Sequence, residues 1–600
     1  MATSRGSKGQ TETAPAAVRV PHTRRLTIIA KDPGVRLEGG AMLFARIEIP
    51  AEDLAPGPTG YRVKVVDFDA TAGRLYKPLQ HYQAPDGTLV DPFRADDGED
   101  VGALAASHQA RLLADPNFHA QNTYAIVMRI LARFEFALGR RIEWGFNGHQ
   151  LNVAPHAFLD ANAFYSNEDS GLMFGYFKGK SGAMVFTALS HDIVAHETTH
   201  ALLDGLRDRF TEPSSPDQAA FHEAFADIVA LLSVFALPEV VAAILGAPPR
   251  GKDDGGKIRG IEPDKLTLAA LQSSILAGIA AQLGLELDGL RGNALRQSVL
   301  LEPDAGLLAS EEFAEPHRRG EVLVAAMMRT ALTLWRSRIE TLGTLEFEGK
   351  GGQYNLDRVI EEGAKVADHL LTMAIRAVDY CPPTDIDFGV YLAAFLTADA
   401  ELMPDDNRFR YRETLRATFA SYGITTPGGG RCADDGSWRG FDAALPVNYA
   451  RSHFESMLRD KDEVFRFIWD NRRVLGIGTR ATIKVGAVRP SIRQSPDGFF
   501  VRETVCTYVQ IANIFGSEVK SVLGVDRPEE LETTRSITAF GGGTIIFDQY
   551  GRIKYHIAHP LNDGERQKKR LASLGEIDGG ETAFDRRNRF ALLHAARASD

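Results

Sequence analysis

Two histidines and a glutamate in this chain have the spacing of a metal-binding motif, H-E-x-x-H, at His196, Glu197 and His200. The stretch from Ser190 to Gly205 has apolar residues at helical spacing between a capping residue and a stop, so it predicts a helix. Four residues make about one helical turn, so both histidines leave the same face and can bind one metal. Glu197 projects beside them, where a carboxylate can act as a general base on a water.

A catalytic zinc usually takes three protein ligands, so a third ligand is expected downstream. The run from Ser215 to Pro238 is largely apolar and predicts a second helix. Glu223 and Asp227 lie four residues apart on one of its faces, and buried carboxylates need partners. A metal would be the partner of Glu223, and the second nitrogen of a ligating histidine would be the partner of Asp227.

These two helices resemble those of the thermolysin-like zinc peptidases, within the gluzincins. That family has H-E-x-x-H on one helix, a glutamate ligand on the next, and an aspartate four residues later. The resemblance covers about residues 103–425 and implies one catalytic zinc and hydrolysis of peptide bonds. It assigns zinc binding to His196, His200 and Glu223, the general base to Glu197, and the orientation of a zinc histidine to Asp227.

Three further segments resemble parts of the same family. Residues 162–165 are similar to its edge-strand segment, which implies that the Asn162 side-chain oxygen and the Ala163 carbonyl hold the amides beside the scissile bond. Arg296 matches an arginine that grips a substrate carbonyl. His317, at the start of a predicted long helix, matches a histidine that stabilises the oxyanion. A histidine at a helix start also has a simpler interpretation, as a cap or a surface residue.

The chain also departs from the family in two places. Thermolysin-like enzymes have a tyrosine between the second zinc histidine and the glutamate, whereas residues 201–222 contain none and Phe210 is the nearest aromatic residue. Asp192 matches one calcium ligand of the family, but Val234 stands where a glutamate is expected, which argues against a double calcium site.

The resulting hypothesis is a zinc-dependent endopeptidase that acts on a peptide or protein substrate. The alternative is a latent or degenerate peptidase that serves as a zinc-dependent binding or regulatory protein, and the missing tyrosine favours it. Regulation by contact with the chain's own C-terminal domain is a further expectation. H-E-x-x-H also occurs by chance on polar, exposed helix faces, so the motif alone does not decide between these interpretations.

The composition of the chain argues against nucleic-acid-binding, disulfide-rich and membrane-spanning proteins. The 600 residues carry a net charge of -11 without an extended basic face, which argues against a nucleic-acid partner. Cys381, Cys432 and Cys506 are the only cysteines, a number and spacing that do not suggest a disulfide framework. We find no signal peptide and no uninterrupted apolar run of about eighteen residues, so we expect a cytoplasmic protein without a membrane span.

The order of predicted strands and helices along the chain indicates an α+β fold, with extra regions on both sides of a two-lobe peptidase core. Residues 1–24 read as a flexible tail, and residues 25–100 alternate apolar and polar positions as β-strands do. The core is expected at 103–425, with a β-rich lobe at 103–189 and a helical lobe at 190–425. Residues 431–600 read as a separate α+β domain of unknown role.

Overall fold

The computed structural model describes residues 22–34, 42–83, 89–94, 106–179, 182–211, 214–247, 258–273, 298–347, 350–494 and 500–577. Within these ranges the chain mixes helices and β-sheets, which confirms the predicted α+β class at that level. Most of the predicted tail and Arg296 lie outside the described residues.

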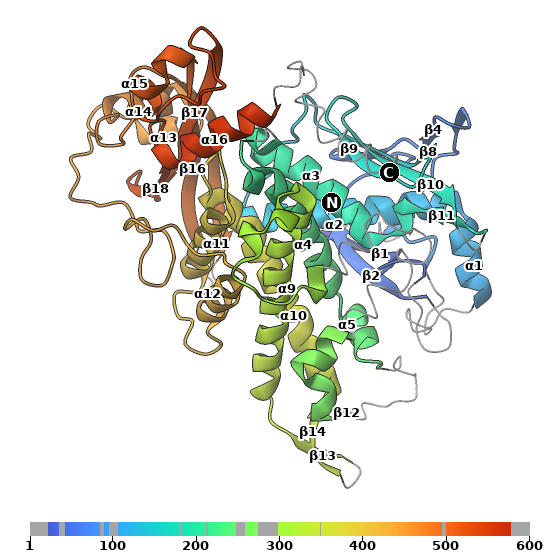
Figure 1. The fold of residues 1–600 in the computed structure, drawn as a ribbon. Coiled ribbons are helices and arrows are strands. Elements are labelled where there is room, and N and C mark those ends of the chain that lie inside the picture. The colour runs from blue at the N-terminus through green and yellow to red at the C-terminus, as the bar shows by residue number, and fades with distance from the viewer. Residues whose placement is uncertain are drawn as a thin grey trace, which may run out of the picture.

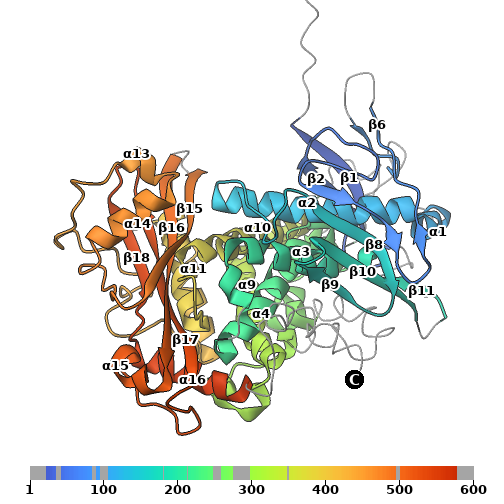
Figure 2. The same ribbon diagram turned by 90° about the horizontal axis from the view of Figure 1, so that it is seen from above.

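A buried helix, α2 (Pro116–Leu138), runs through the N-terminal half of the molecule (Figure 2). Its start is capped by the Asp115 side chain, and it ends at Gly139, whose φ of 65° lies in the left-handed region that favours glycine. The antiparallel pair β1 (Thr23–Ile29) and β2 (Phe44–Pro50) packs against it. Alternating apolar residues of these strands face the helix and anchor the N-terminal region there.

The β-rich half contains a five-stranded sheet in the order β11-β10-β8-β3, with β9 paired to β10 as well. Both β3 and β10 run parallel to β8, whereas β9 and β11 run antiparallel to β10. Its strands are β3 (Val63–Val65), β8 (Leu151–Leu159), β9 (Ala163–Ser166), β10 (Gly171–Lys178) and β11 (Met184–Phe186). Since β3 comes from residues 25–100, that region and residues 103–189 share one sheet.

Long helices form the middle of the molecule (Figure 1). They are α3 (His191–Leu206), α4 (Pro216–Phe235), α9 (Pro316–Glu340), α10 (Leu356–Ala377), α11 (Phe388–Leu402) and α12 (Tyr411–Ser421). Shorter elements complete the two halves: α1 (Ala106–Ala114), α5 (Pro238–Ile244), β4 (Phe68–Asp69), β5 (Arg74–Leu75), β6 (Tyr82–Gln83), β7 (Leu89–Val90), β12 (Gly260–Ile261), β13 (Leu345–Phe347) and β14 (Lys350–Asn355).

Helix α4 lies at the centre of this group and packs against α3, α9 and α10. Within the described residues it is the one helix long and apolar enough to cross a membrane by length and composition. Its apolar window is 89% buried by the surrounding protein, so in this structure it is a core helix. A helix that is apolar on all sides is expected at such a position.

A four-stranded antiparallel sheet dominates the C-terminal region, on the far side of the helices from β1 and β2 (Figure 2). Its strands are β15 (Thr482–Gln494), β16 (Phe500–Phe515), β17 (Ser536–Phe547) and β18 (Ile553–His559). The helices around it are α13 (Phe454–Met457), α14 (Lys461–Asp470), α15 (Val519–Leu523) and α16 (Gly564–Ile577).

Both faces of this C-terminal sheet are covered at its central strands, β16 and β17. Ile545 and Cys506 pack with α14 in a local cluster, whereas their neighbours Ile546 and Val505 belong to the main core of the molecule. Adjacent residues of a strand point to opposite faces, so apolar pairs of this kind give a sheet that is covered on both sides. The described part of residues 431–577 therefore shares the hydrophobic core of the preceding region.

Polar contacts join the same two regions at helix ends. The guanidinium of Arg489 on β15 donates to the carbonyls of Gly205 and Leu206 at 2.8 and 3.1 Å, at the end of α3. Arg493 contacts the buried carboxylate of Asp379 at 2.6 Å. Burial would raise the pKa of Asp379, but its arginine neighbours hold that pKa below the ordinary value. Strand β15 thus supplies the partners that the last carbonyls of α3 need.

Candidate metal centre

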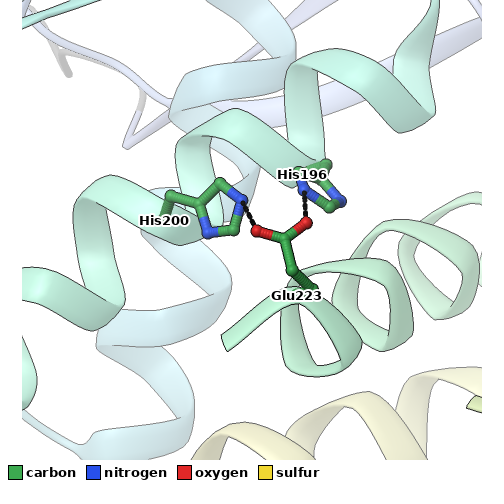
Figure 3. Close-up of side chains that lie close together, drawn as sticks. All are labelled: His196, His200 and Glu223. Atoms are coloured by element: carbon green, nitrogen blue, oxygen red, sulfur yellow. Dashed lines mark ion pairs between the residues drawn. The ribbon is translucent and has the colours of Figure 1, made fainter. Parts of the chain in front are cut away.

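Helices α3 and α4 bring the predicted ligands together. His196 and His200 lie one turn apart on α3 and are 3% and 2% exposed. Glu223 lies on α4, which begins at Pro216 after the Ser215 hydroxyl caps its first turn. Both imidazoles point at the Glu223 carboxylate across the α3–α4 interface (Figure 3).

The geometry of these three side chains fits a metal ion. The Nε2 atoms of His196 and His200 each lie 3.5 Å from a different oxygen of Glu223. The three ligand atoms lie within 4.8 Å of one another, so the buried group can bind a metal ion. In a tetrahedral zinc site with bonds of about 2.0–2.2 Å, neighbouring ligand atoms lie about 3.3–3.6 Å apart. Two nitrogens and one oxygen are also a donor set that zinc accepts.

Each histidine has a partner at its other ring nitrogen. The Nδ1 atom of His196 lies 2.7 Å from an oxygen of Asp227, the contact expected from the sequence. The Nδ1 atom of His200 lies 2.8 Å from Nδ1 of His222, a contact that the sequence analysis missed. The sequence did contain a signal for this contact. His222 precedes Glu223 on an otherwise apolar helix, and a buried imidazole needs a polar partner.

Glu197 is fully buried beside the two histidines. Its Oε2 atom accepts a hydrogen bond of 3.1 Å from the backbone N–H of Tyr165 on β9. Strand β9 has one neighbour among the described strands, β10, so its other edge faces α3. The carboxylate of Glu197 therefore lies between the ligand helix and the edge of the sheet.

Asn162 and Ala163 lie at the start of this edge strand. The Asn162 carbonyl accepts from the Gly175 N–H at 2.8 Å, and its side-chain oxygen accepts from the Ala163 N–H at 2.8 Å. Backbone groups alternate in direction along a strand. Because the Tyr165 N–H points away from β10 toward Glu197, the carbonyl of Ala163, two residues earlier, lies on the same outer edge.

A second contact joins β9 to α3 below the ligands. The Tyr165 hydroxyl donates to Asp204 at 2.9 Å, and the Asn167 amide donates to the same oxygen at 2.6 Å. Burial raises the pKa values of both Tyr165 and Asp204. Strand β9 thus contacts α3 at both Glu197 and Asp204, which are more than one helical turn apart. The spacing of residues in the sequence did not predict this second contact.

His317 lies in the first turn of α9. Its Nδ1 atom is 2.6 Å from an oxygen of Glu315, and its buried Nε2 atom has no hydrogen-bond partner among the described residues. Burial would raise the pKa of Glu315, but hydrogen bonds from His317 and from backbone N–H groups outweigh it and lower that pKa to about 2.

The start of α9 lies against the turn of α4 that holds Glu223. A Cβ atom added at Gly320 would lie 3.1 Å from the Ala220 carbonyl oxygen and 3.4 Å from the Ala224 Cβ. Ala220 and Ala224 flank Glu223 in the sequence, so glycine permits a close approach of the two helices here. His317 lies one turn before Gly320, next to this helix contact.

Phe210 and Asp192, the two residues compared with the oxyanion tyrosine and a calcium ligand of the thermolysin-like pattern, both lie within the described residues. Phe210 is 1% exposed and packs against Phe221, with ring centroids 5.7 Å apart. Asp192 lies beside Lys31 and Asp32 of the N-terminal region. Burial lowers the pKa of Lys31 to about 8, against the attraction of these two carboxylates, while burial and the proximity of Asp192 raise the pKa of Asp32 to about 6.

No family model matches the chain, and no curated protein is similar to it in sequence. The assignment of a function therefore depends on the site itself. Arg296 is the one predicted site residue that lies outside the described residues.

Proposed function

We propose that this protein is a zinc-dependent endopeptidase. The observation that carries the proposal is the arrangement at the α3–α4 interface: three buried ligand atoms converge, and the carboxylate of Glu197 lies next to them at the edge of a β-sheet. A group that only binds metal has no use for a second buried carboxylate beside it, because burying a charge is costly.

Zinc held by His196, His200 and Glu223 would polarise the scissile carbonyl and lower the pKa of a water molecule. In the proposed reaction, Glu197 accepts the proton of that attacking water. The same carboxyl group then donates the proton to the leaving amine nitrogen, so the residue ends in its starting state. The contact with the Tyr165 N–H holds the Glu197 carboxylate in place during these transfers.

Charge that develops on the carbonyl oxygen needs a donor, and His317 is the group we propose for it. Its Nδ1–H is directed at Glu315, which leaves Nε2 for the substrate. A protonated Nε2 would donate to the developing oxyanion. Glu315 acts through His317 and does not itself reach the substrate.

The outer edge of β9 is the proposed position for the peptide. An extended peptide can add to an edge strand by backbone hydrogen bonds, and its alternate side chains then enter the site. The Ala163 carbonyl lies on this edge, two residues from the strand position that contacts the general base. We assign Asn162 and Ala163 to substrate binding on this basis and on the resemblance to thermolysin-like peptidases.

The first test measures zinc content and cleavage of a quenched peptide library for the wild type and Glu197→Gln. We expect one zinc in both proteins and activity in the wild type alone, because loss of a general base costs about 10² to 10⁴ in rate. Cleavage by Glu197→Gln at the wild-type rate would refute the assignment of the base.

A second candidate function is a latent or degenerate peptidase that binds zinc without turnover. The observation that favours it is Phe210, which is buried in the segment where related enzymes have a tyrosine donor. One zinc per chain with no hydrolysis in the wild type would support this candidate.

A cytoplasmic location is a further proposal. The three cysteines, Cys381, Cys432 and Cys506, form no disulfide, which is consistent with a reducing compartment.

A further inference from the structure

We propose that His222 is a positioning residue that holds His200 in the ring orientation and the tautomer required for zinc binding. The inference rests on the proposed zinc function and names a residue of the same site. The Nδ1 atoms of the two rings are 2.8 Å apart, their centroids are 4.8 Å apart and their planes are nearly parallel at 23°. Both side chains are buried, so water does not compete for this contact.

The position of the protons follows from the contacts. One N–H and one lone pair are needed for a hydrogen bond between two ring nitrogens. The Nε2 atom of His200 faces Glu223 and must offer its lone pair to a metal, so the Nδ1 atom of His200 carries the hydrogen. His222 must then accept at Nδ1 and carry its own hydrogen at Nε2. The opposite arrangement would put a hydrogen on Nε2 of His200, where it blocks the metal.

The two zinc histidines therefore have chemically different supports. His196 donates to the carboxylate of Asp227, which can only accept and so fixes one tautomer of His196. His200 donates to a neutral imidazole, which accepts in one of its own tautomers and adds no charge. The role of His222 is thus the placement of one acceptor atom, and any side chain that places an acceptor there should replace it.

Substitutions at His222 separate this role from a general packing role. Asparagine places its side-chain oxygen close to the position of a histidine Nδ1 atom, and glutamine places it close to the position of Nε2. Leucine has a similar volume and no acceptor. The matched control is His119→Leu, because His119 forms another buried histidine pair, with Nδ1 of His119 2.8 Å from Nε2 of His156, and neither of these residues belongs to α3 or α4.

The experiment measures zinc affinity of the full chain by competition with a chromophoric chelator, without substrate. We expect His222→Leu to bind zinc about 10- to 100-fold more weakly, the usual cost of losing the partner of a metal ligand. His222→Asn should stay within a few-fold of the wild type, and His119→Leu should bind zinc normally. If His222→Leu does not fold, the comparison of His222→Asn with His222→Gln replaces it, and the glutamine variant should be the weaker binder.

Wild-type affinity in His222→Leu, or equal losses in the asparagine and glutamine variants, would overturn the proposal. Because no substrate is present, the result is independent of turnover: a wild type that binds zinc but cleaves nothing would refute the peptidase and still test His222. A wild type that binds no zinc would overturn both.

Discussion

Two buried histidine pairs lie in different parts of this protein, and they differ in what their outer nitrogens contact. The saturated pair consists of His119 on α2 and His156 on β8. Its contacts form a chain: Asp67 to His156 at 2.8 Å, His156 to His119 at 2.8 Å, and His119 to the Leu113 carbonyl at 2.9 Å. The metal-site pair, His200 and His222, has one such contact between its rings and directs Nε2 of His200 toward Glu223.

Proton counting explains the difference. The saturated pair makes three hydrogen bonds between acceptors at its two ends, and three bonds need three protons, one more than two neutral imidazoles carry. Asp67 balances the extra charge. Burial and the neighbouring ring lower the pKa of His119 to about 3, so this ring is neutral near pH 7. In the metal-site pair the corresponding nitrogen faces a second histidine and a carboxylate, where a metal can replace the proton.

The strongest test of the comparison is Asp67→Asn. This change removes the carboxylate that lies 2.8 Å from Nδ1 of His156, while the ring contacts keep their shape. Loss of one partner of a buried ion pair costs about 3–5 kcal/mol, so urea unfolding should show a decrease in stability of that order. Zinc affinity should not change. A decrease below about 1 kcal/mol would mean that the pair is neutral.

Zinc itself should distinguish the two pairs. Free zinc at 100 times its Kd should raise the free energy of unfolding by about 2.7 kcal/mol, because the ligands converge only in the folded chain. Glu223→Gln should lose most of this gain, whereas Asp67→Asn should keep it despite its lower starting stability. Equal stabilisation of Glu223→Gln and the wild type by zinc would move the metal away from this site.

A smaller effect is expected from Asp227→Asn. The amide keeps the size of the side chain but removes the charge that supports His196, so zinc should bind about 10- to 100-fold more weakly. Competition with a chelator measures this change, and Asp217→Asn on the same helix is the control. Asp217 contacts Arg319 on α9. An unchanged affinity in Asp227→Asn would remove the carboxylate from the metal site.

The smallest effect concerns pH in zinc-free buffer with a chelator. The folded pKa of His119 is about 3, below the ordinary unfolded value of about 6.5. The unfolded chain therefore binds more protons between these values, and the stability due to neutral His119 is present above pH 6.5 and is lost as pH falls. From pH 6.5 to 5.5 this one group should cost about 1 kcal/mol, because the unfolded imidazole is already half protonated at pH 6.5. His119→Gln should lose that much less than the wild type over the same step.

The residues of the metal site were predictable because the relevant geometry is local. The spacing of His196 and His200 places both on one helix face, and the spacing of Glu223 and Asp227 does the same on the next helix. An apolar run around two carboxylates also indicates that they are buried and need partners. The structure brings these four side chains together as expected, with each histidine within 3.5 Å of Glu223.

Contacts across the sequence were not predictable in the same way. Glu315 beside His317, Tyr165 beside Asp204, and His222 beside His200 each depend on which helices and strands pack together. The pairing of β3 with β8, which joins part of residues 25–100 to the β-rich half, was not predictable either. The alternation of residues in a short strand shows that it is a strand but does not show which strand it pairs with.

By itself the sequence determined the helices, the ligand types and the face from which each ligand projects, since these follow from spacing within one turn. Only the tertiary structure decided that Glu197 reaches the edge of β9 and that β15 covers the end of α3. The physical reason is that burial leaves each polar group in need of a partner, and the packing of distant elements decides which partner is within reach.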